Sequence, residues 1–593
     1  MCKYRPMKLF LATTAAAISI SLLANDRPNI LFIITDDHAV QAFGTSAGDS
    51  PVPFPNFRRL ANEGMVFDRS YCGNSLCGPS RATIYTGRHS HRNAYLYNGG
   101  PAFDGSQPTF PKILQAAGYQ TALIGKWHLD SKPTGFDHWE IFWNQGEYYN
   151  PDYFDLPAGA DGNGAAYSSW RRKRVPGYST DITTSKALDW LDNRDKAKPF
   201  ALVVAHKAPH RPWLPAPRHL GKAKEYLAAL EPPATFFDEY ANRPASMLLN
   251  EQTISHHFAV WSDEHILPPE FFTDPANKDL LRDALGTDDF TPYIADREVC
   301  QTVEIPGYLW RLGELQRMDR AQKTEWVRYH AARTRDLIER VKSGELKDPE
   351  KLAVWRWRTY LEDYLGTIMA VDESIGTILD YLDAHSLSRD TLVVYCGDQG
   401  FYTGEHGMYD KRWILEESFR MPLVMRWPGR IKAGTRSTAM VQNIDYGPTF
   451  CHLAGLDEEA KKAGMQGRDL SPLFTTGTDD AFEDRPLYYA FYENPGEHNA
   501  PRHDGLRTSR WTFARFAKNR NWPQGKPFTF SDEWLLIDNA ADPLQLVNRA
   551  ADPDYKTVFE SLKSLYETER ARYLVPDWLP QGDLRNVKPA WIE

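Results

Sequence analysis

Four short hydrophobic segments, at residues 29–35, 121–125, 200–205 and 391–397, each end in polar residues. Each segment is apolar at nearly every position rather than at alternate positions, which predicts strands that are covered by helices on both faces. Such strands are mostly parallel, and ligands bind beyond their carboxyl ends. We therefore expect an α/β fold with a large, mostly parallel sheet sandwiched between helices.

The polar residues that follow these strands are expected to meet at one edge of the sheet. In chain order they are Asp36, Asp37, Lys126, His128, His206, His210, Asp398 and Gln399. Lys126 and His128 are two residues apart, so in an extended chain their side chains point the same way. Acids, amides and bases gathered at one edge predict a catalytic crevice.

Helices are expected between the strands. Residues 181–191 and 351–383 carry apolar residues at intervals of three and four, as helices packed on a sheet do. Residues 220–349 are charged, become strongly helical towards their end and lack the strand pattern, so we interpret them as an insertion that forms part of a substrate rim. A catalytic domain is predicted over residues 25–475.

A smaller C-terminal α+β domain is predicted over residues 485–593. The linker before it is rich in threonine, glycine and aspartate, at residues 475–480. Aromatic runs at 486–491 and 511–516 predict strands of a small antiparallel sheet, and residues 555–573 predict a terminal helix.

Residues 1–24 are expected to be a secretory signal peptide. Lys3, Arg5 and Lys8 precede an apolar stretch over residues 9–24, and Cys2 lies before that stretch, which argues against a lipoprotein anchor. The alternative is an apolar terminal helix that the mature protein keeps. We expect a periplasmic or secreted protein that is not membrane-bound after cleavage.

Composition narrows the class of protein. The 593 residues are 42% hydrophobic and 25% charged, which is typical of a soluble globular chain too long for a single core. The formal charge of −9 gives no sign of nucleic-acid binding, so an anionic substrate must be attracted locally. One dense basic run, Arg171 to Arg174, follows Tyr167 and Trp170 and is interpreted as a solvated surface loop.

Six cysteines in a chain of this length do not indicate a disulfide scaffold. Apart from Cys2 and Cys77, the remaining four, Cys72, Cys300, Cys396 and Cys451, allow three pairings, and the sequence does not choose among them. Cys396 lies in an apolar run and is predicted to be a buried free thiol.

The segment Cys77-Gly78-Pro79-Ser80-Arg81 carries the candidate nucleophile. Pro79 suits the first position of a helix and Gly87 the residue after its end, which predicts a helix over 80–86 with Cys77 just before it. A side chain there faces the positive end of the helix dipole, where an oxyanion is stabilised, and Arg81 in the first turn adds donors. Alone, Cys77 would be an ordinary half-buried thiol.

Together with the downstream Thr86-Gly87-Arg88, this segment resembles the Cys-x-Pro-Ser-Arg signature of type I sulfatases. Further motifs of that family occur in the same order: Asp36-Asp37, Gly125-Lys126-Trp127-His128, Ala208-Pro209-His210-Arg211-Pro212, and Asp398-Gln399-Gly400-Phe401 followed by Lys411. The resemblance spans residues 27–475 and implies an alkaline-phosphatase-like fold and hydrolysis of sulfate esters.

The resemblance also implies a cofactor, a modification and a metal site. A formylglycine-generating maturation enzyme would oxidise Cys77 to formylglycine, whose hydrate has one hydroxyl to attack sulfur and another to expel sulfate. The resemblance implies calcium, which hard oxygen ligands suit, and magnesium is the less favoured alternative. Its ligands would be Asp36, Asp37, Asp398, Gln399 and the modified Cys77. Gln399 stands where relatives often have asparagine or histidine.

The remaining catalytic roles follow from the same resemblance. Arg81 and Lys126 would hold sulfate oxygens, and Lys411 would contact the sulfate or the leaving oxygen. His128 would orient or deprotonate the hydrated aldehyde. His210 would protonate the leaving alcohol, with the nearby His206 as its rival.

The segment 398–407, with Lys411-Arg412, is most similar to carbohydrate sulfatases, including those that act on the 6-sulfate of N-acetylglucosamine and on marine polysaccharides. A sulfated saccharide is therefore the expected substrate. Aromatic side chains could stack on its rings, and residues of the smaller domain could reach the crevice; these are Trp139, Trp143, Tyr148, Tyr149, Trp213, His503 and Arg507. The alternatives are a phosphate or phosphonate ester hydrolase of the same superfamily and an inactive glycan-binding relative.

Overall fold

The computed structural model describes residues 27–45, 50–155, 170–259, 263–303, 312–494, 496–517 and 530–576. The predicted signal peptide, at residues 1–24, and Tyr167 lie outside these ranges. Within them, no helix combines the length and the hydropathy that crossing a membrane requires.

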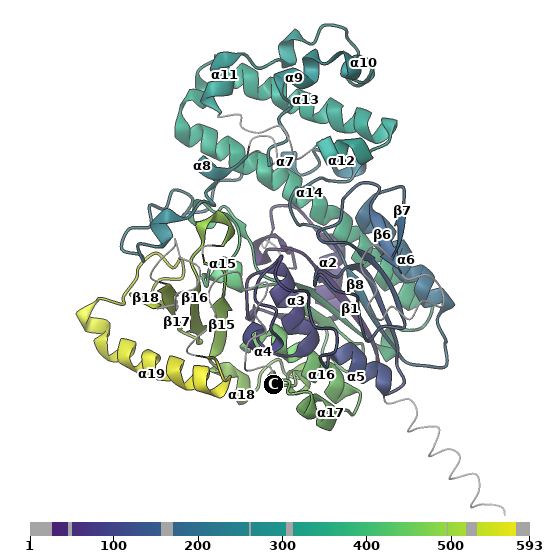
Figure 1. Ribbon diagram of the computed structural model, residues 1–593, viewed down its shortest axis with the longest axis vertical. Helices are drawn as coiled ribbons and strands as arrows, with labels where there is room; N and C mark the ends of the chain where they lie inside the picture. Colours follow the sequence, from purple (N-terminus) through teal and green to yellow (C-terminus); the bar gives the residue numbers. More distant parts are fainter. Residues whose placement is uncertain are drawn as a thin grey trace, which may run out of the picture.

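The large sheet has ten strands in the order β13-β2-β12-β9-β1-β8-β4-β5-β6-β7. Figure 1 labels its strands β1, β8, β6 and β7. Its central strands run parallel: β9 (Thr391–Gly397), β1 (Asn29–Thr35), β8 (Phe200–Ala205), β4 (Gln120–Lys126) and β5 (His138–Phe142). Antiparallel pairs occur only towards the edges, at β6 (Asp152–Asp155), β7 (Arg171–Arg174), β12 (Leu423–Arg426) and β2 (Met65–Phe67), with β13 (Thr435–Ser437) outermost. The predicted mostly parallel sheet is confirmed at its centre.

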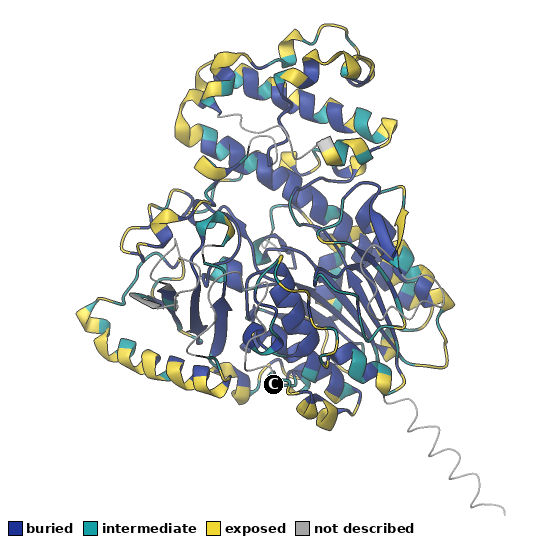
Figure 2. Ribbon diagram, viewed as in Figure 1, coloured by how far each residue is buried: buried dark blue, intermediate teal, exposed yellow. Residues whose placement is uncertain are grey.

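Helices cover both faces of this sheet, because successive side chains of a strand point to opposite sides. Ile30, Phe32 and Ile34 of β1 pack in the cluster that contains α3 (Cys77–Thr86), α5 (Phe110–Ala116) and α16 (Tyr446–Leu453). Leu31 and Ile33 pack with α2 (Pro55–Glu63), α6 (Ser179–Asn193) and α14 (Pro349–Ala384). Figure 2 shows the buried sheet between these layers. Each such buried side chain stabilises the fold by about 1.5–3 kcal/mol.

The register of the central strands aligns their carboxyl ends. Thr35 pairs with Gly397, and Ala205 pairs with both Ile34 and Gly125. The residues that directly follow these strands, among them Asp36 and Asp398, therefore leave the sheet at one edge. Gly125 is required for this alignment: its φ is 105°, and a Cβ there would lie 1.9 Å from the Ala205 carbonyl oxygen.

The predicted insertion, residues 220–349, consists of helices joined by turns and loops where the structure describes it. Figure 1 shows its helices α9 (Pro269–Thr273), α10 (Lys278–Leu285), α11 (Arg297–Thr302) and α13 (Arg320–Lys342) as a lobe over the start of α14. The predicted long helix over 351–383 corresponds to α14 and is extended by Asp348, which accepts hydrogen bonds from the backbone N–H groups of Glu350 and Lys351.

The C-terminal region holds an antiparallel sheet of β15 (Leu487–Phe491), β16 (His503–Arg507), β17 (Trp511–Ala517) and β18 (Phe530–Asp538), as predicted. Helix α19 (Lys556–Arg572) covers one face, where Tyr566 packs on Phe513. The opposite face, which includes Tyr489 and Phe516, belongs to the same hydrophobic cluster as β1. This face makes the small sheet continuous with the main core.

The basic run Arg171 to Arg174 forms the edge strand β7 rather than a loop, so that prediction was wrong. Cross-strand ion pairs explain the strand: Arg171 pairs with Asp155, and Arg172 and Arg174 pair with Asp152, all on β6. All four basic residues are exposed, and these pairs neutralise much of their charge.

None of the described cysteines forms a disulfide. Cys72, Cys77, Cys300, Cys396 and Cys451 are free thiols, so none of the three open pairings is made. The prediction that Cys396 is a buried free thiol is confirmed.

Candidate active site

Cys77 is the first residue of helix α3, not the residue before it as predicted. Leu76 is extended, and its carbonyl accepts the first helical hydrogen bond from Ser80 N at 2.9 Å. Pro79 fits at the third position because the first four N–H groups of a helix need no helical partner. Arg81 consequently lies in the second turn. The helix ends as predicted at Gly87, with φ 61°.

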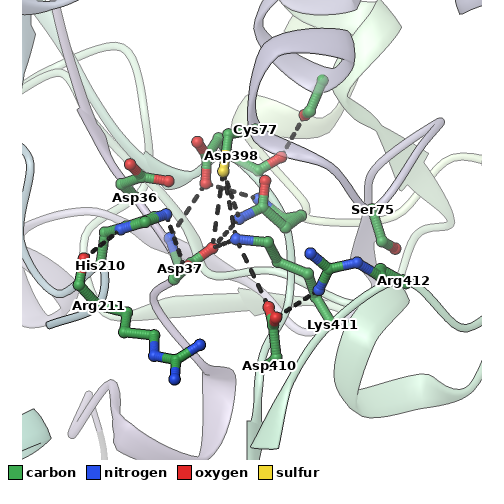
Figure 3. A network of polar contacts seen from close by, with 12 residues as sticks. Asp36, Asp37, Ser75, Cys77, His210, Arg211, Asp398, Asp410, Lys411 and Arg412 are labelled. Atoms are coloured by element: carbon green, nitrogen blue, oxygen red, sulfur yellow. Dashed lines mark hydrogen bonds and ion pairs between the residues drawn. The ribbon is translucent and has the colours of Figure 1, made fainter. Parts of the chain in front are cut away.

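The Cys77 thiol is buried among charged and polar side chains from other segments (Figure 3). Its Sγ lies 3.2 Å from Nζ of Lys411 and 3.9 Å from both Nε2 of Gln399 and Oδ1 of Asp37. Lys411 and Gln399 also donate hydrogen bonds to Oδ1 of Asp37. Burial raises the pKa of the thiol, and Lys411 opposes this shift.

Three buried carboxylates meet three cations around this thiol. Lys126 pairs with Asp36 and also bonds Gln145, while Nε of Arg81 donates to Oδ2 of Asp398 at 3.0 Å. Lys411 pairs with Asp37. Burial raises the pKa of Asp37 to about 7, with Lys411 acting in the opposite direction. The register of the sheet is what brings these segments together.

Part of this cluster fits a divalent cation. Asp36, Asp37, Cys77 and His210 each offer a ligand atom within 4.8 Å of the others. Oδ1 of Asp36 and Oε1 of Gln399 are buried without a hydrogen-bond partner, and such oxygen atoms suit a hard cation.

Asp398, predicted as a ligand, is placed differently. Its Oδ1 accepts from the backbone N–H groups of Asp37 and Gln399, each at 3.1 Å, and its Oδ2 accepts from Arg81. It is not in the group of four that converge within 4.8 Å.

The structure separates the two candidate histidines after β8. His210 lines the pocket in front of Cys77, with Nε2 3.7 Å from Oδ2 of Asp37 and Nδ1 2.6 Å from the Arg211 carbonyl oxygen. His206 faces α14, where its Nε2 lies 3.2 Å from Oγ of Ser374, and it is absent from the pocket lining. Burial lowers the pKa of His206 to about 3, as expected for a core histidine.

His128 does not continue an extended strand, so the expectation that it points the same way as Lys126 for that reason was wrong. Strand β4 ends at Lys126, and His128 has φ 55°. The ring is buried, and its Nδ1 has no hydrogen-bond partner. Burial, and then the charge of Lys126, lower its pKa well below the usual range.

A pocket of about 440 Å³ opens in front of Cys77. Asp37, His210 and Lys411 line it as the sequence predicted. Residues that sequence reasoning missed also line it: Asn98, Gln145, Lys207, Glu314, Asp410, Arg412 and Glu497. A signal existed for Asp410 and Arg412, which flank Lys411, whereas Glu314 and Glu497 come from segments without any motif.

Most of the predicted aromatic platform lies elsewhere. Trp213 lines the pocket. Trp139 and Trp143 pack against Trp170, 5.3 and 5.5 Å from it between ring centroids. Tyr149 bonds the Pro215 carbonyl at 2.5 Å, and Tyr148 bonds the His210 carbonyl at 2.7 Å. Tyr148 and Tyr149 thus support the segment that carries His210 instead of facing the pocket.

We expected His503 and Arg507 to reach the crevice, but neither lines the pocket. His503 is buried, and its Nε2 accepts a hydrogen bond from Ile414 N at 3.2 Å. Arg507 pairs with Glu416 at 3.2 Å. Both fasten the small sheet to the segment that follows Lys411.

Two family profiles match the chain. The sulfatase profile matches residues 28–456, and that of N-sulphoglucosamine sulphohydrolase, C-terminal, matches residues 404–572. The chain is 38% identical over 569 residues to an N-acetylglucosamine-6-O-sulfatase of Bacteroides thetaiotaomicron, covering 94% of this chain and 90% of that protein. It is 25% identical to a human N-acetylglucosamine-6-sulfatase, covering 75% of this chain and 64% of the relative.

Solved structures agree with this similarity. A protein solved in complex with its substrate D-glucosamine-2-N,6-O-disulfate superposes with a TM-score of 0.78 at 37% identity, covering 93% of this chain and 99% of that one. A phosphonate monoester hydrolase from Silicibacter pomeroyi, with a TM-score of 0.56 at 19% identity over 92% of this chain and 96% of its own, shares the fold. With a profile match over most of its length and a close relative across nearly all of it, the chain belongs to the sulfatase family and is a sulfuric ester hydrolase.

Proposed function

We propose that this enzyme removes the 6-O-sulfate of a glucosamine-type sugar, such as N-acetylglucosamine 6-sulfate. The observation that carries the proposal is the 38% identity to an N-acetylglucosamine-6-O-sulfatase across 94% of the chain. The similar structure solved with a 2-N,6-O-disulfated glucosamine supports the same substrate class. An ulvan-active sulfatase of Formosa agariphila is only 23% identical, which favours the amino sugar over a marine polysaccharide.

The proposed nucleophile is formylglycine, made from Cys77 by a formylglycine-generating enzyme. Its hydrate would supply one hydroxyl to attack sulfur and a second whose return to the aldehyde releases sulfate. In the unmodified protein the Cys77 thiol contacts Lys411 and Gln399, which also bond Asp37. These contacts support a fixed orientation towards the pocket.

The proposed metal is calcium, with magnesium the weaker alternative. Its ligands would be Asp36, Asp37, Gln399 and the modified Cys77. Asp398 would join them if its carboxylate gave up the hydrogen bonds that it now accepts from N–H groups. Calcium would polarise the sulfate and lower the pKa of the attacking hydroxyl. The orphaned oxygens of Asp36 and Gln399 support this ligand set.

Several cations are proposed to bind the sulfate oxygens. Nη2 of Arg81 is buried without a hydrogen-bond partner, so it has a donor to spare. Nζ of Lys411 already lies 3.2 Å from Sγ of Cys77, and Lys126 pairs with Asp36. His210, on the pocket side of Asp37, is proposed to protonate the leaving alcohol, and His128 to orient the hydrated aldehyde.

We also propose that residues 1–24 act as a signal peptide and that the enzyme works in the periplasm or outside the cell. Sulfated saccharides are large anionic substrates, and degradation outside the cytoplasm fits such a leader. Sequencing the amino terminus of the protein secreted by its host would test this: a mature chain that still begins at Met1 would contradict it.

The test of the proposed activity compares esters that differ in one atom. Protein produced with a formylglycine-generating enzyme is expected to release sulfate from N-acetylglucosamine 6-sulfate at least about 100-fold faster than phosphate from the 6-phosphate. Mass spectrometry of the Cys77 peptide measures the conversion of the thiol. Cys77→Ala should abolish turnover without moving the unfolding midpoint.

A preference for the phosphate would refute the sulfate specificity and favour the phosphate or phosphonate ester hydrolase. Near-normal activity of Cys77→Ala would refute the nucleophile. Complete conversion of Cys77 without turnover of any ester would favour the glycan-binding relative.

A further inference from the structure

A second pocket lies on the helical lobe, between α7 (Lys224–Leu227), α13 and α14. We call it the lobe pocket. It has a volume of about 250 Å³ and shares no lining residue with the pocket in front of Cys77. Figure 1 shows α14 running from this lobe towards the sheet. Small-molecule pockets span about 300–1,000 Å³, so the lobe pocket lies at their small end and suits a ligand of about one sugar unit.

Cations outnumber acids in the lobe pocket. Two of the cations are neutralised by carboxylates of the same lobe: Arg333 makes a bidentate pair with Asp363, at 2.7 and 3.0 Å, and Arg340 pairs with Glu345. The remaining cations therefore decide the sign of the charge that a ligand meets. The charged lining residues are Lys224, Arg333, Arg340, Arg358, Asp336 and Glu362.

Lys224 and Arg358 are the uncompensated cations. Nη2 of Arg358 donates to the Leu230 carbonyl oxygen at 3.0 Å, but its Nε is buried without a hydrogen-bond partner. Lys224 is exposed at the start of α7. Within the described part of the chain, neither side chain forms an ion pair. A buried donor without a partner, beside a second free cation, calls for an anionic acceptor from a ligand.

Glu362 does not repel such an anion as an ionised carboxylate would. Its Oε1 lies 3.1 Å from Nη2 of Arg333, and its Oε2 forms no hydrogen bond with any residue that the structure describes. Burial, and then the charge of Asp363, raise the pKa of Glu362, and Lys224 acts in the opposite direction. A raised pKa favours the neutral acid, whose O–H donates to an anion.

Two aromatic rings complete the lobe pocket. Nε1 of Trp355 donates to Oδ2 of Asp336 at 3.2 Å, which fixes the indole. The guanidinium of Arg333 lies 5.3 Å from the centroid of the Tyr329 ring. Fixed aromatic faces beside charged donors suit a sugar ring that carries an anionic group, because such a ligand has both apolar and charged surface.

We propose that the lobe pocket is a second saccharide site, which binds a sulfate or carboxylate group on a sugar unit of an anionic glycan. Lys224, Arg358 and Glu362 would donate to the anion, and Trp355 and Tyr329 would border the sugar ring. The site would hold the enzyme on its glycan separately from the reacting end. The inference rests on the saccharide substrate class of the proposed function and not on the 6-O position.

The first test measures binding by calorimetry. Cys77→Ala protein, which does not consume the ligand, is titrated with a sulfated, uronate-bearing hexasaccharide. It is expected to show a binding step besides that at the active site. Lys224→Gln together with Arg358→Gln should weaken this step by about 10- to 100-fold, because both changes remove charged donors.

The matched control is Lys278→Gln together with Lys351→Gln. These changes remove the same charge from exposed lysines of the helical lobe that do not line the lobe pocket. The additional binding step should therefore be unchanged in this variant.

A second measurement needs no change in the lobe. Cys77→Ala protein is acetylated with and without the hexasaccharide, and mass spectrometry follows the rate at Lys224, Lys278 and Lys351. The hexasaccharide should slow acetylation of Lys224 and leave the other two lysines unchanged. Inorganic sulfate at the same concentration should protect none of them, because it lacks the ring that the aromatic side chains contact.

Each outcome bears on the lobe pocket. Equal weakening in the two double variants would show that net charge alone acts and would overturn the site, as would acetylation of Lys224 that the hexasaccharide does not slow. Equal protection of Lys224 by inorganic sulfate would overturn the saccharide as the ligand in favour of a free anion.

Turnover separates this inference from the proposed function. In enzyme that keeps Cys77, kcat/KM on N-acetylglucosamine 6-sulfate should be the same with and without the changes at Lys224 and Arg358. A fall there would contradict a site separate from the active site. Wild type that turns over none of this ester would refute the proposed function, whereas the binding and acetylation results test the lobe pocket independently.

Discussion

His503 should make the stability of this enzyme depend on pH. Its ring is fully buried at the start of β16, with Nδ1 donating to the Pro501 carbonyl at 2.8 Å and Nε2 accepting from Ile414 N at 3.2 Å. Phe516 stacks on it at 5.0 Å. Protonation would place a charge in this apolar setting and remove the acceptor that Ile414 needs. Burial accordingly lowers the pKa of His503 from 6.5 to about 4.

The sign and size of the effect follow from linkage. Between pH 6.5 and pH 4 the unfolded chain binds a proton at this residue and the folded chain does not, so stability falls as the pH falls through that window. The stabilisation is fully present above pH 6.5. Its complete loss corresponds to about 3 kcal/mol, of which about 1 kcal/mol is already lost between pH 7.5 and 5.5.

The assay is urea unfolding of wild type and His503→Gln at pH 7.5, 6.5 and 5.5. Glutamine keeps an acceptor for Ile414 and does not titrate, so the variant should be less stable at pH 7.5 but should lose about 1 kcal/mol less than wild type on acidification. His385→Gln, at an exposed histidine, is the control for the change of histidine to glutamine itself. Parallel pH profiles of wild type and His503→Gln would refute a buried neutral imidazole.

Two other predictions concern the metal and the strand ends. EGTA should abolish sulfate release and added calcium should restore it, because buried oxygens of Asp36 and Gln399 have no other partner; activity that survives chelation and dialysis would contradict the metal site. Gly125→Ala should lower the free energy of unfolding by about 3 kcal/mol or more, since its Cβ would lie 1.9 Å from the Ala205 carbonyl oxygen. Gly118→Ala, also at positive φ but with open space, should cost only about 1 kcal/mol in urea unfolding, and equal costs would contradict the crowding at Gly125.

The sheet and the meeting of its polar ends could be predicted because both follow from local patterns. A continuous apolar run such as residues 391–397 indicates a strand buried on two faces, and parallel strands share one edge for their carboxyl ends. Asp36, Lys126 and Asp398 therefore meet near Cys77 as expected. The small C-terminal sheet followed from aromatic runs in the same way.

Features that depend on contacts between segments far apart in the sequence could not be predicted in this way. The edge strand β7 exists because Asp152 and Asp155 face its arginines, a pairing that no local pattern of residues 171–174 reveals. Likewise, Glu497 reaches the pocket through a segment of the smaller sheet. His503 is a histidine, as many catalytic bases are, and only its burial in the structure shows that it belongs to the core.

The charge balance of the site limits what a loss of activity can mean. Asp36, Asp37 and Asp398 are buried, and each is compensated by a cation from another segment, namely Lys126, Lys411 and Arg81. Removing one partner leaves an uncompensated buried charge, which destabilises a protein by about 3–5 kcal/mol. Neutralising any of these six residues therefore weakens the fold and the chemistry together. Cys77→Ala removes no such charge. An inactive but stably folded Cys77→Ala protein would therefore assign Cys77 a role in the reaction. An inactive Lys126 variant would not do so for Lys126, because the same change destabilises the fold.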